Sequence, residues 1–408
     1  MRFSVVPTMC LILGLVGLLL GCGGAPEAPE PEGPTLSKGL LLALAVLEDG
    51  PDGKPVPQPA RLGVLSQVDG QWTWRELEDA DSNVFHKAMV FKAADGGAGV
   101  LTAGGTAAAL KLWRVGQEPM TIWTEDFGGK WSRMRDIEIG DIYGDGVPTI
   151  AVATHDQGVV ATVRQGDDGA WEVNELDREA NTIVHEVEIG DLDADGVMEI
   201  YATPSLPNKL DGTPQPGWVA RYVPAKEEGR VTVADLGDRH AKEILVEDVD
   251  GDGVDELYVV VEAVAGGEVE ILRFDADTKP TEGHLVATIP DKLCRFLTAG
   301  DVDGDGDLEV VAAAHKSGLW LLEPTAGDDL WKRTQIDGVS GGFEHAALLT
   351  DLDGDGSDEL YVANDKGAEV NRYVWIDGRP VKETLYSYPD GLKGFTWNIM
   401  VAPLDVIP

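Results

Sequence analysis

A short acidic motif recurs along this 408-residue chain, and its spacing restricts the possible folds more than any other feature. The motif reads D-x-D-x-D-G-x-x-E and begins at Asp191, Asp248, Asp301 and Asp351, with a weaker copy at Asp141. Successive copies start 50, 57, 53 and 50 residues apart. A period of this size is typical of repeat architectures, in which one supersecondary unit stacks on the next.

Each complete motif places four carboxylates within nine positions, and such a group needs a counter-ion. If the chain turns tightly at the glycine, the side chains at positions 1, 3, 5 and 9 converge, and the backbone carbonyl at position 7 adds a ligand. Hard oxygen ligands in this number favour Ca²⁺ over Mg²⁺ or zinc. We therefore predict four complete calcium sites, with the following ligands: Asp191, Asp193, Asp195, Val197 and Glu199; Asp248, Asp250, Asp252, Val254 and Glu256; Asp301, Asp303, Asp305, Asp307 and Glu309; Asp351, Asp353, Asp355, Ser357 and Glu359.

The copy at Asp141 is degenerate. It keeps Asp141 and Asp145 but has Tyr143 and Thr149 where the second aspartate and the glutamate belong, so we expect this fifth site to be weak or empty. An EF-hand is excluded, because the residues at position 12 are apolar and β-branched strand formers follow each loop. The alternative that the motifs are only Asp-Gly hairpin turns does not explain the recurring glutamate.

These residues at this spacing resemble the FG-GAP/VCBS repeats of integrin α-subunit propellers and of many bacterial surface proteins. The resemblance covers most of residues 84 to 364. It implies a β-propeller in which calcium ions act as rigid struts on one face and partners generally use the opposite face.

Counting the strands leads to an all-β fold, a seven-bladed β-propeller with four-stranded blades. Six repeats begin with an apolar first strand, and a seventh such strand, "FTWNIMVAPL", lies at the C-terminal end. The N-terminal part supplies three strands that lack a first strand: "GLLLALAVL", "ARLGVLSQV" and "QWTWREL". We therefore expect the C-terminal strand to close the first blade, which would remove two open sheet edges.

The N-terminus has the pattern of a secretory signal, with one arginine, a short apolar run and then Cys22. "LLGC" resembles the lipobox of bacterial lipoproteins, which implies lipidation of Cys22. The expected organisation is a lipoprotein signal over residues 1–21, a lipidated cysteine with a Pro- and Glu-rich tether over 22–37, and the propeller over 38–408. The chain would then be lipid-anchored in a bacterial cell envelope, outside the cytoplasm, with the outer membrane or cell surface favoured.

The chain carries 72 acidic against 32 basic residues, a formal net charge of −40, which argues against nucleic acid as a partner. Basic and aromatic residues nevertheless stand six positions before each metal loop, where the first strands begin. We expect them to surround the ring axis on the face opposite the metals, together with His155, and to bind a protein or an anionic glycan: Arg135, His185, Lys242, Arg295, His345 and Trp397. Histidines at this position could instead satisfy backbone groups at the blade junctions.

Three functions remain open at this stage. The favoured one is a monomeric, non-catalytic binding or scaffold module, because no nucleophile elbow or zinc-protease motif occurs. The second is an enzyme similar to polysaccharide lyases or sugar dehydratases, which would use the axial residues on a uronate. The third is a purely structural envelope protein. Residues 48 to 60 and 203 to 217 form long loops on the expected ligand face and are the segments most suited to a specific partner.

Overall fold

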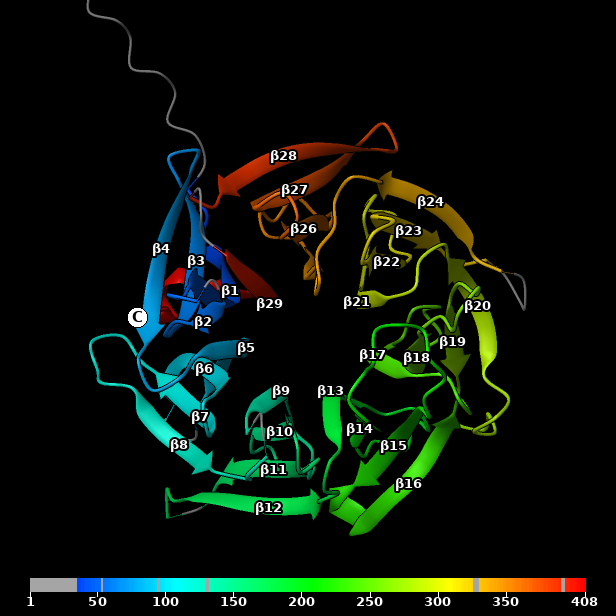
Figure 1. Ribbon diagram of the computed structural model, residues 1–408, viewed down its shortest axis with the longest axis horizontal. Coiled ribbons are helices and arrows are strands. Elements are labelled where there is room, and N and C mark those ends of the chain that lie inside the picture. Colours follow the sequence, from blue (N-terminus) through cyan, green and yellow to red (C-terminus); the bar gives the residue numbers. More distant parts are fainter. Residues whose placement is uncertain are drawn as a thin grey trace, which may run out of the picture.

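The computed structural model describes residues 35–408 apart from residues 53, 94–95, 130–131, 167, 326–329 and 390–392. The signal segment, Cys22 and most of the expected tether lie outside the described residues. The described chain forms antiparallel sheets arranged as seven blades around a central axis (Figure 1). None of its helices has the length and apolar character that a membrane crossing requires.

We number the blades from the N-terminus. Blade 1 contains β1 (Lys38–Asp49), β2 (Pro55–Pro57), β3 (Ala60–Val68), β4 (Gln71–Asp79) and β29 (Lys393–Pro403). Blade 2 contains β5 (Val84–Lys92), β6 (Ala98–Gly105), β7 (Ala108–Trp113) and β8 (Met120–Glu125). Blade 3 contains β9 (Met134–Gly140), β10 (Thr149–Thr154), β11 (Val160–Gln165) and β12 (Trp171–Asp177). Blade 4 contains β13 (Ile183–Gly190), β14 (Glu199–Ser205), β15 (Trp218–Val223) and β16 (Glu228–Asp235).

The remaining three blades follow the same order. Blade 5 contains β17 (Ala241–Glu247), β18 (Glu256–Val261), β19 (Val269–Phe274) and β20 (His284–Ile289). Blade 6 contains β21 (Cys294–Gly300), β22 (Glu309–Ala314), β23 (Leu319–Glu323) and β24 (Lys332–Asp337). Blade 7 contains β25 (Ala347–Thr350), β26 (Glu359–Asn364), β27 (Glu369–Ile376) and β28 (Arg379–Ser387). Two short 3₁₀ turns, η1 (Pro224–Lys226) and η2 (Leu404–Val406), complete the described elements.

The predicted seven blades and their closure are confirmed. β29 pairs antiparallel with β1, from Lys38 opposite Pro403 to Leu47 opposite Lys393, so the last strand of the chain is the inner strand of the first blade. The inner strands contact one another in a complete circle, β29 to β5, β9, β13, β17, β21, β25 and back to β29. The sequence did not predict β2, a three-residue strand that pairs with the C-terminal end of β1, from Leu47 to Asp49.

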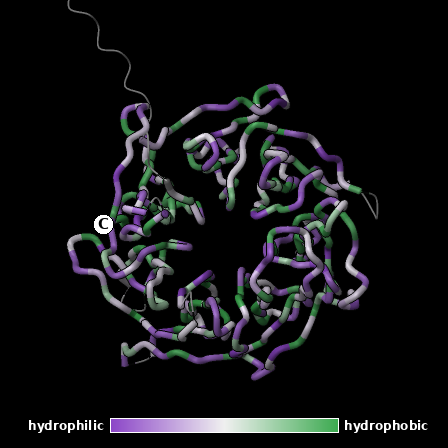
Figure 2. The backbone as a smooth tube through the Cα atoms, viewed as in Figure 1, coloured by the Kyte–Doolittle hydropathy of each residue, from purple (hydrophilic) through white to green (hydrophobic). Residues whose placement is uncertain are grey.

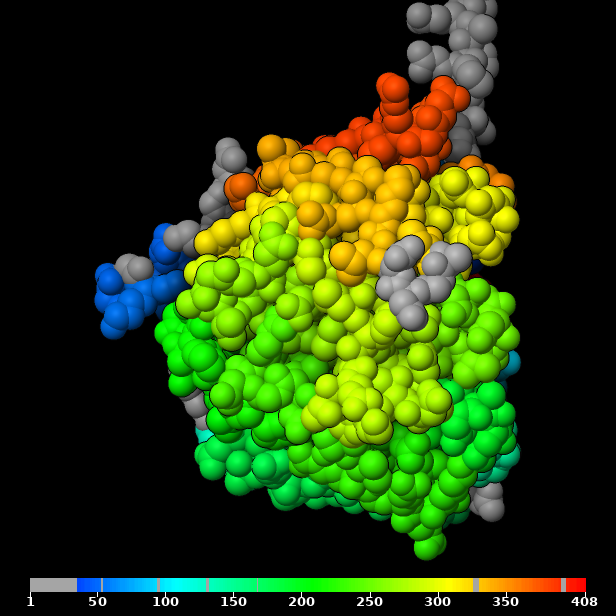
Figure 3. Space-filling view, turned by 90° about the vertical axis from the view of Figure 1, so that its right-hand side faces the viewer, coloured from blue at the N-terminus to red at the C-terminus, as the bar shows by residue number. Residues whose placement is uncertain are grey.

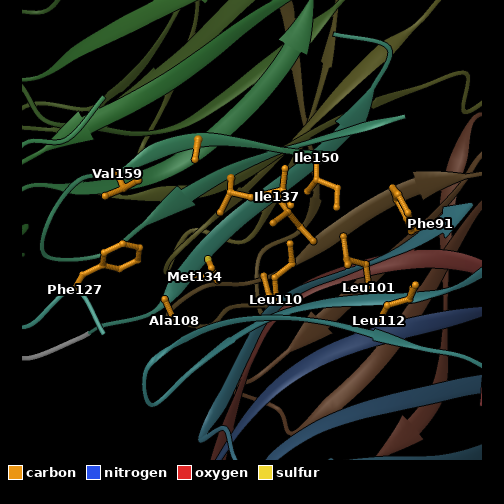
Figure 4. Packing of buried hydrophobic residues seen from close by; sticks show 14 of the residues in the cluster. Phe91, Leu101, Ala108, Leu110, Leu112, Phe127, Met134, Ile137, Ile150 and Val159 are labelled. Carbon is orange, nitrogen blue, oxygen red and sulfur yellow. The ribbon is translucent and has the colours of Figure 1, made fainter. Parts of the chain in front are cut away.

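The hydrophobic core lies between neighbouring blades. Between blades 2 and 3, for example, Leu101, Leu110 and Leu112 pack against Ile137 and Ile150, all of them buried (Figure 4). Hydrophobic stretches recur in the blades around the whole ring (Figure 2). Because a blade alone would leave these faces in water, each one is stabilised by its neighbours, and the closed ring folds as one unit.

The ring has two faces of different character. Loops from the first to the second strand, and from the third to the fourth, lie on the face where the inner strands end, which we call the metal-loop face. The starts of the inner strands lie on the other face, which we call the mouth face. The β1–β2 hairpin belongs to the mouth face and projects beyond the body of the ring when the ring is viewed edge-on (Figure 3).

Candidate metal loops and the opposite mouth face

Each complete acidic loop is held in a tight turn by its own carboxylates. In blade 5, Asp248 accepts hydrogen bonds from the backbone N–H groups of Asp252 (3.0 Å) and Gly253 (2.9 Å), and Asp252 accepts one from Val254 (2.9 Å). Gly253 has φ of 91°, a conformation that favours glycine. The same three bonds recur in blades 4, 6 and 7. The same hydrogen-bond pattern therefore shapes all four complete loops.

The donor set of these loops fits a hard divalent cation. In blade 5, carboxylate oxygens of Asp248, Asp250, Asp252 and Glu256 all lie within 4.8 Å of one another. Groups of three meet the same limit in the other loops: Asp191, Asp193 and Asp195; Asp301, Asp303 and Glu309; Asp351, Asp353 and Asp355. Clustered carboxylates at this distance repel one another unless a cation neutralises them. Glu199, Asp305 and Glu359 lie outside these groups, and the ligand roles of all the loop carboxylates and of the carbonyls of Val197, Val254, Asp307 and Ser357 stay predictions.

A shared pair of side chains supports the distal glutamate in three of the loops. Tyr201, Tyr258 and Tyr361 each donate a hydrogen bond to the glutamate two residues before them. An arginine from the third strand of the blade approaches a carboxylate of the same loop. Arg221 lies 3.0 Å from Glu199, Arg273 lies 3.4 Å from Asp250 and Arg372 lies 3.6 Å from Asp353. Part of the negative charge of these loops is thus balanced by the protein itself.

The degenerate loop of blade 3 carries an internal cation. Arg164 on β11 lies 2.6 Å from Asp145, and its guanidinium stacks over the ring of Tyr143 at 4.9 Å. Asp141 still accepts hydrogen bonds from the N–H groups of Asp145 (3.0 Å) and Gly146 (2.9 Å), so the turn is retained. Only two aspartates remain in this loop, and the arginine supplies the positive charge beside them.

The loop of blade 6 is the opposite case. Val311 replaces the tyrosine, and Leu321 takes the place that the arginines occupy on the third strands of blades 4, 5 and 7. Within the described part of the chain, no lysine or arginine forms an ion pair with this loop. Glu323 lines the same hollow of about 200 Å³ as Asp303 and Glu309, and it pairs there with Lys332 at 2.6 Å. The negative charge of the blade 6 loop is therefore the least balanced of the five.

The mouth face carries a belt of eight aromatic and imidazole rings around the axis. Consecutive ring centroids are 4.5 to 6.4 Å apart. The belt runs in this order: His315, Phe343, Phe395, Trp397, His86, His155, His185 and His240. Glu262 and Arg295 close the circle, because Glu262 lies 3.4 Å from both His240 and Arg295, and Arg295 lies over Phe343 at 5.3 Å.

Charged side chains from distant blades meet inside the belt. Lys242 of blade 5 forms an ion pair with Glu344 of the blade 6–7 linker, and Arg135 of blade 3 lies 3.8 Å from the same carboxylate. Although burial opposes ionisation, Lys242, Arg295 and Arg135 together hold the pKa of Glu344 below its ordinary value. These contacts cross the axis and join blades that are not neighbours.

The residues predicted to surround the axis do come together there, with one exception. Arg135, His185, Lys242 and Arg295 are buried near the axis, and His155 and Trp397 belong to the belt. The three cationic groups already have protein counter-charges. Their ligand roles stay a prediction.

His345 is the exception. Its side chain is fully buried, and its two ring nitrogens contact Ser340 Oγ and the carbonyl of Ala314, each at 2.8 Å. It has φ of 62°, so these two bonds stabilise an unusual backbone at the blade 6–7 junction. His345 therefore has no ring nitrogen available for a ligand and acts as a structural residue that positions Phe343 and Glu344.

Four members of the belt, Phe343, Phe395, His86 and His240, were not singled out by their sequence positions. A fixed offset from each metal loop fails because the inner strands are irregular where they begin. Register shifts interrupt the pairing between Phe85 and Lys87, and between Ala241 and Ile244. Such bulges redirect side chains that regular alternation would point elsewhere.

Three imidazoles of the belt have a lowered pKa, which favours their neutral form. Burial, reinforced by the positive charge of Arg135, holds the pKa of His86, His155 and His185 well below the ordinary value for histidine. Nitrogens of His86, His185 and His240 are closed to solvent and have no hydrogen-bond partner. The belt is thus a packed wall, and a ligand on this face would meet its outer surface.

Comparison with known proteins supports the fold. Residues 248–342 match the family model of the FG-GAP-like repeat. The structure of the Dos1 propeller is similar, with a TM-score of 0.54 at 10% identity, covering 88% of this chain and 86% of that one. A protein from Lactobacillus plantarum gives a TM-score of 0.55 at 12% identity, over 89% of this chain and 99% of the other. No curated protein matches the sequence. At these identities the structural likeness establishes the fold alone.

Proposed function

We propose, from the premise of a seven-bladed propeller with FG-GAP-like repeats, that this protein is an envelope-tethered binding module. Calcium braces the ring on one face, and a protein or anionic glycan partner docks on the other. The observation that carries the proposal is the convergence of carboxylate oxygens within 4.8 Å in four loops of one face. Four ions there would stiffen the ring and leave the mouth face free.

The path of the N-terminal segment supports this division of the two faces. The N–H of Asp69 donates to Thr35 Oγ1 (2.9 Å), and the N–H of Leu36 donates to the carbonyl of Gln67 (3.1 Å). Asp69 lies in the turn from β3 to β4, which belongs to the metal-loop face. A lipid on Cys22 would therefore tether the ring through a segment that joins it on the metal-loop face.

An enzyme at the axis is the weaker candidate. Arg135, Lys242 and Arg295 have protein counter-charges, and the imidazole nitrogens that could move a proton are closed to solvent. General acid–base catalysis requires such a group within hydrogen-bond reach of substrate. This arrangement favours binding over catalysis.

The calcium part of the proposal is tested on the full chain. Four bound ions are expected by native mass spectrometry in Ca²⁺. Each site contributes about 2.7 kcal/mol of stability at a calcium concentration of 100 Kd. Excess EGTA should therefore lower the melting temperature by roughly 10 °C or more. An unchanged melting temperature together with no bound metal would overturn the proposal.

Anchoring and partner binding need their own measurements. Cys22→Ser should release the protein from the membrane fraction, whereas Cys10→Ser, within the signal segment, should not. A pull-down from native envelope in Ca²⁺ should recover a partner, and that partner should be lost when EGTA is added. A Cys22→Ser protein that remains membrane-bound would contradict the lipid anchor and leave the calcium test unaffected.

A further inference from the structure

The eighth residue of the metal loop differs between the blades. It is Asp255 in blade 5 and Asp358 in blade 7, but Met198 in blade 4, Leu308 in blade 6 and Pro148 in blade 3. This position stands between the seventh residue, whose carbonyl is a predicted ligand, and the ninth, the distal glutamate. The two aspartates are half-buried, although they are not predicted ligands themselves. Their contacts show what they do instead.

Each of these aspartates binds the first aspartate of the preceding blade's loop. The N–H of Asp301 in blade 6 donates to Asp358 Oδ2 at 2.8 Å, and the N–H of Asp358 donates to the carbonyl of Asp301 at 2.7 Å. In the same way, the N–H of Asp191 in blade 4 donates to Asp255 Oδ2 at 2.8 Å. Hydrogen bonds to an ionised acceptor are among the stronger ones in proteins. We call these two contacts the loop bridges.

The residue before each bridged aspartate is a glycine, and the bridge needs the space that it leaves. A Cβ atom on Gly300 would lie 2.6 Å from Asp358 Oδ2, and one on Gly190 would lie 2.9 Å from Asp255 Oδ2. Both distances are shorter than a side-chain carbon tolerates. At the end of the inner strand of blade 3, a Cβ atom on Gly140 would meet a neighbouring side chain at 3.4 Å, which is an ordinary contact.

The bridges join the metal loops in pairs. Blade 4 is bridged to blade 5, and blade 6 is bridged to blade 7. Between blades 5 and 6 the corresponding residue is Leu308, which packs against the hydrophobic core and has no carboxylate to offer. Between blades 3 and 4 it is Met198, which is exposed. The junction of blades 5 and 6 is therefore an unbridged pair of complete loops within the same ring.

We propose that Asp255 and Asp358 are positioning residues that couple calcium binding between the two loops of each bridged pair. Ser357 and Glu359, the predicted ligands on either side of Asp358, become fixed when the loop of blade 7 is loaded. The carboxylate of Asp358 then holds Asp301 in place as a ligand in blade 6. This inference rests on the proposed calcium-braced module and adds that its ions bind as two cooperative pairs.

The sign of the coupling separates a bridge from simple electrostatics. A bound Ca²⁺ weakens the negative potential that attracts the next ion, so charge alone gives a second ion of equal or lower affinity. A bridge gives the opposite sign, because the first ion orders a ligand of the second site. Coupling between sites is reciprocal and typically changes affinity about 5- to 150-fold.

The test compares a bridged pair with an unbridged pair in the full chain. Asp193→Asn with Asp250→Asn removes a ligand from blades 4 and 5 and leaves the bridged loops of blades 6 and 7. Asp193→Asn with Asp353→Asn leaves the unbridged loops of blades 5 and 6. Native mass spectrometry during a calcium titration counts the molecules that carry zero, one and two ions. After correction for the number of free sites, the second ion should bind about fivefold or more tightly than the first in the bridged chain, and no more tightly in the unbridged chain.

Substitutions of the bridge itself separate its role from general stability. In the bridged chain, Asp358→Ala should remove the cooperativity, while both ions still bind at higher calcium. Asp358→Asn keeps an oxygen that can accept the N–H of Asp301, so it should retain most of the cooperativity. Met198→Ala changes the same loop position where no bridge exists, and this matched control should change nothing.

Two results would overturn the inference. One is a second ion that binds no more tightly in the bridged chain than in the unbridged chain, and the other is cooperativity that survives Asp358→Ala. Both leave the calcium-braced module intact, whereas a wild-type protein without bound metal is the failure of the proposed function itself. If the two-site chains do not fold, the four-site protein gives the answer: Asp358→Ala should make calcium loading less steep than Met198→Ala does, and equal steepness would contradict the bridge.

Discussion

The loops of blades 3 and 6 form the same turn, but they differ in how the protein balances their negative charge. In blade 3, Arg164 supplies a positive charge to the two remaining aspartates. In blade 6 the equivalent region holds Leu321 and the pair of Glu323 with Lys332, and no described lysine or arginine forms an ion pair with the four acids of the loop motif. The comparison indicates that the turn itself is set by hydrogen bonds from backbone N–H groups to the aspartates, whereas the third strand of the blade decides whether an arginine pairs with the loop.

The largest expected difference between the two loops comes from removing one acid. Asp303→Asn in blade 6 removes a ligand of a site that has no internal cation. The variant should therefore lose one bound calcium and up to about 2.7 kcal/mol of calcium-dependent stability. Asp145→Asn in blade 3 is the matched control and should cost the same in calcium and in EGTA. Equal calcium dependence in the two variants would break the comparison.

The pH dependence of the metal-free protein should follow the distal glutamate. Burial raises the pKa of Glu309 to about 7, above its value in the unfolded chain, whereas blade 3 has Thr149 at this position. A raised pKa favours the protonated folded form, so stability in EGTA should fall as the pH rises from about 4.5 to about 7. Urea midpoints across this window measure the effect, which Glu309→Gln should reduce. If Glu309→Gln leaves the slope unchanged, Glu309 is not its source.

An arginine introduced into blade 6 should make its loop resemble the others. Leu321→Arg places a guanidinium at the position of Arg221, Arg273 and Arg372, beside a hollow of about 200 Å³ that can receive it. The ion pair should compete with calcium by up to about 1 kcal/mol, or roughly fivefold in Kd. Calcium titration of this variant against Leu321→Met gives the comparison. Unchanged affinity would mean that the third-strand arginines do not tune the sites.

The smallest effect is expected in blade 3. Arg164→Gln removes the cation beside Asp145, in a partly exposed ion pair, and should cost 1 kcal/mol or less, as is usual for such pairs (about 0–1 kcal/mol). The cost should be the same with and without calcium, because two aspartates are too few to hold the ion. Denaturant unfolding in both conditions measures it. A fifth calcium ion in this variant would show that Arg164 excludes the metal by itself.

Most of the fold could be predicted because short stretches of sequence mark the strands and the turns between them. The acidic motif marks where the inner strands of blades 3 to 7 end, and the leftover strand at the C-terminus has its counterpart in the three strands that follow residue 38. β2 was missed because Pro55–Pro57 is short and rich in proline, which argues against a strand in the interior of a sheet.

The mouth face could be predicted only in part. The sequence identifies Arg135, Lys242 and Arg295, because each stands six positions before the first aspartate of a metal loop. The pairing of Lys242 with Glu344 is not visible, because it joins residues 102 positions apart across the axis. The bulges near Phe85 and Ala241 hid His86 and His240, and the role of Arg164 depended on the register between β10 and β11.

The pairing of β29 with β1 also sets an order of events during synthesis. β1 is an apolar strand whose inner neighbour is made roughly 340 residues later. At about 5 to 20 residues per second, the first blade lacks that neighbour for roughly 20 to 70 seconds. During this interval Leu40, Leu41 and Leu42 have no inner strand to pair with, so the part of the ring that is made first keeps an open sheet edge until the last strand has been made.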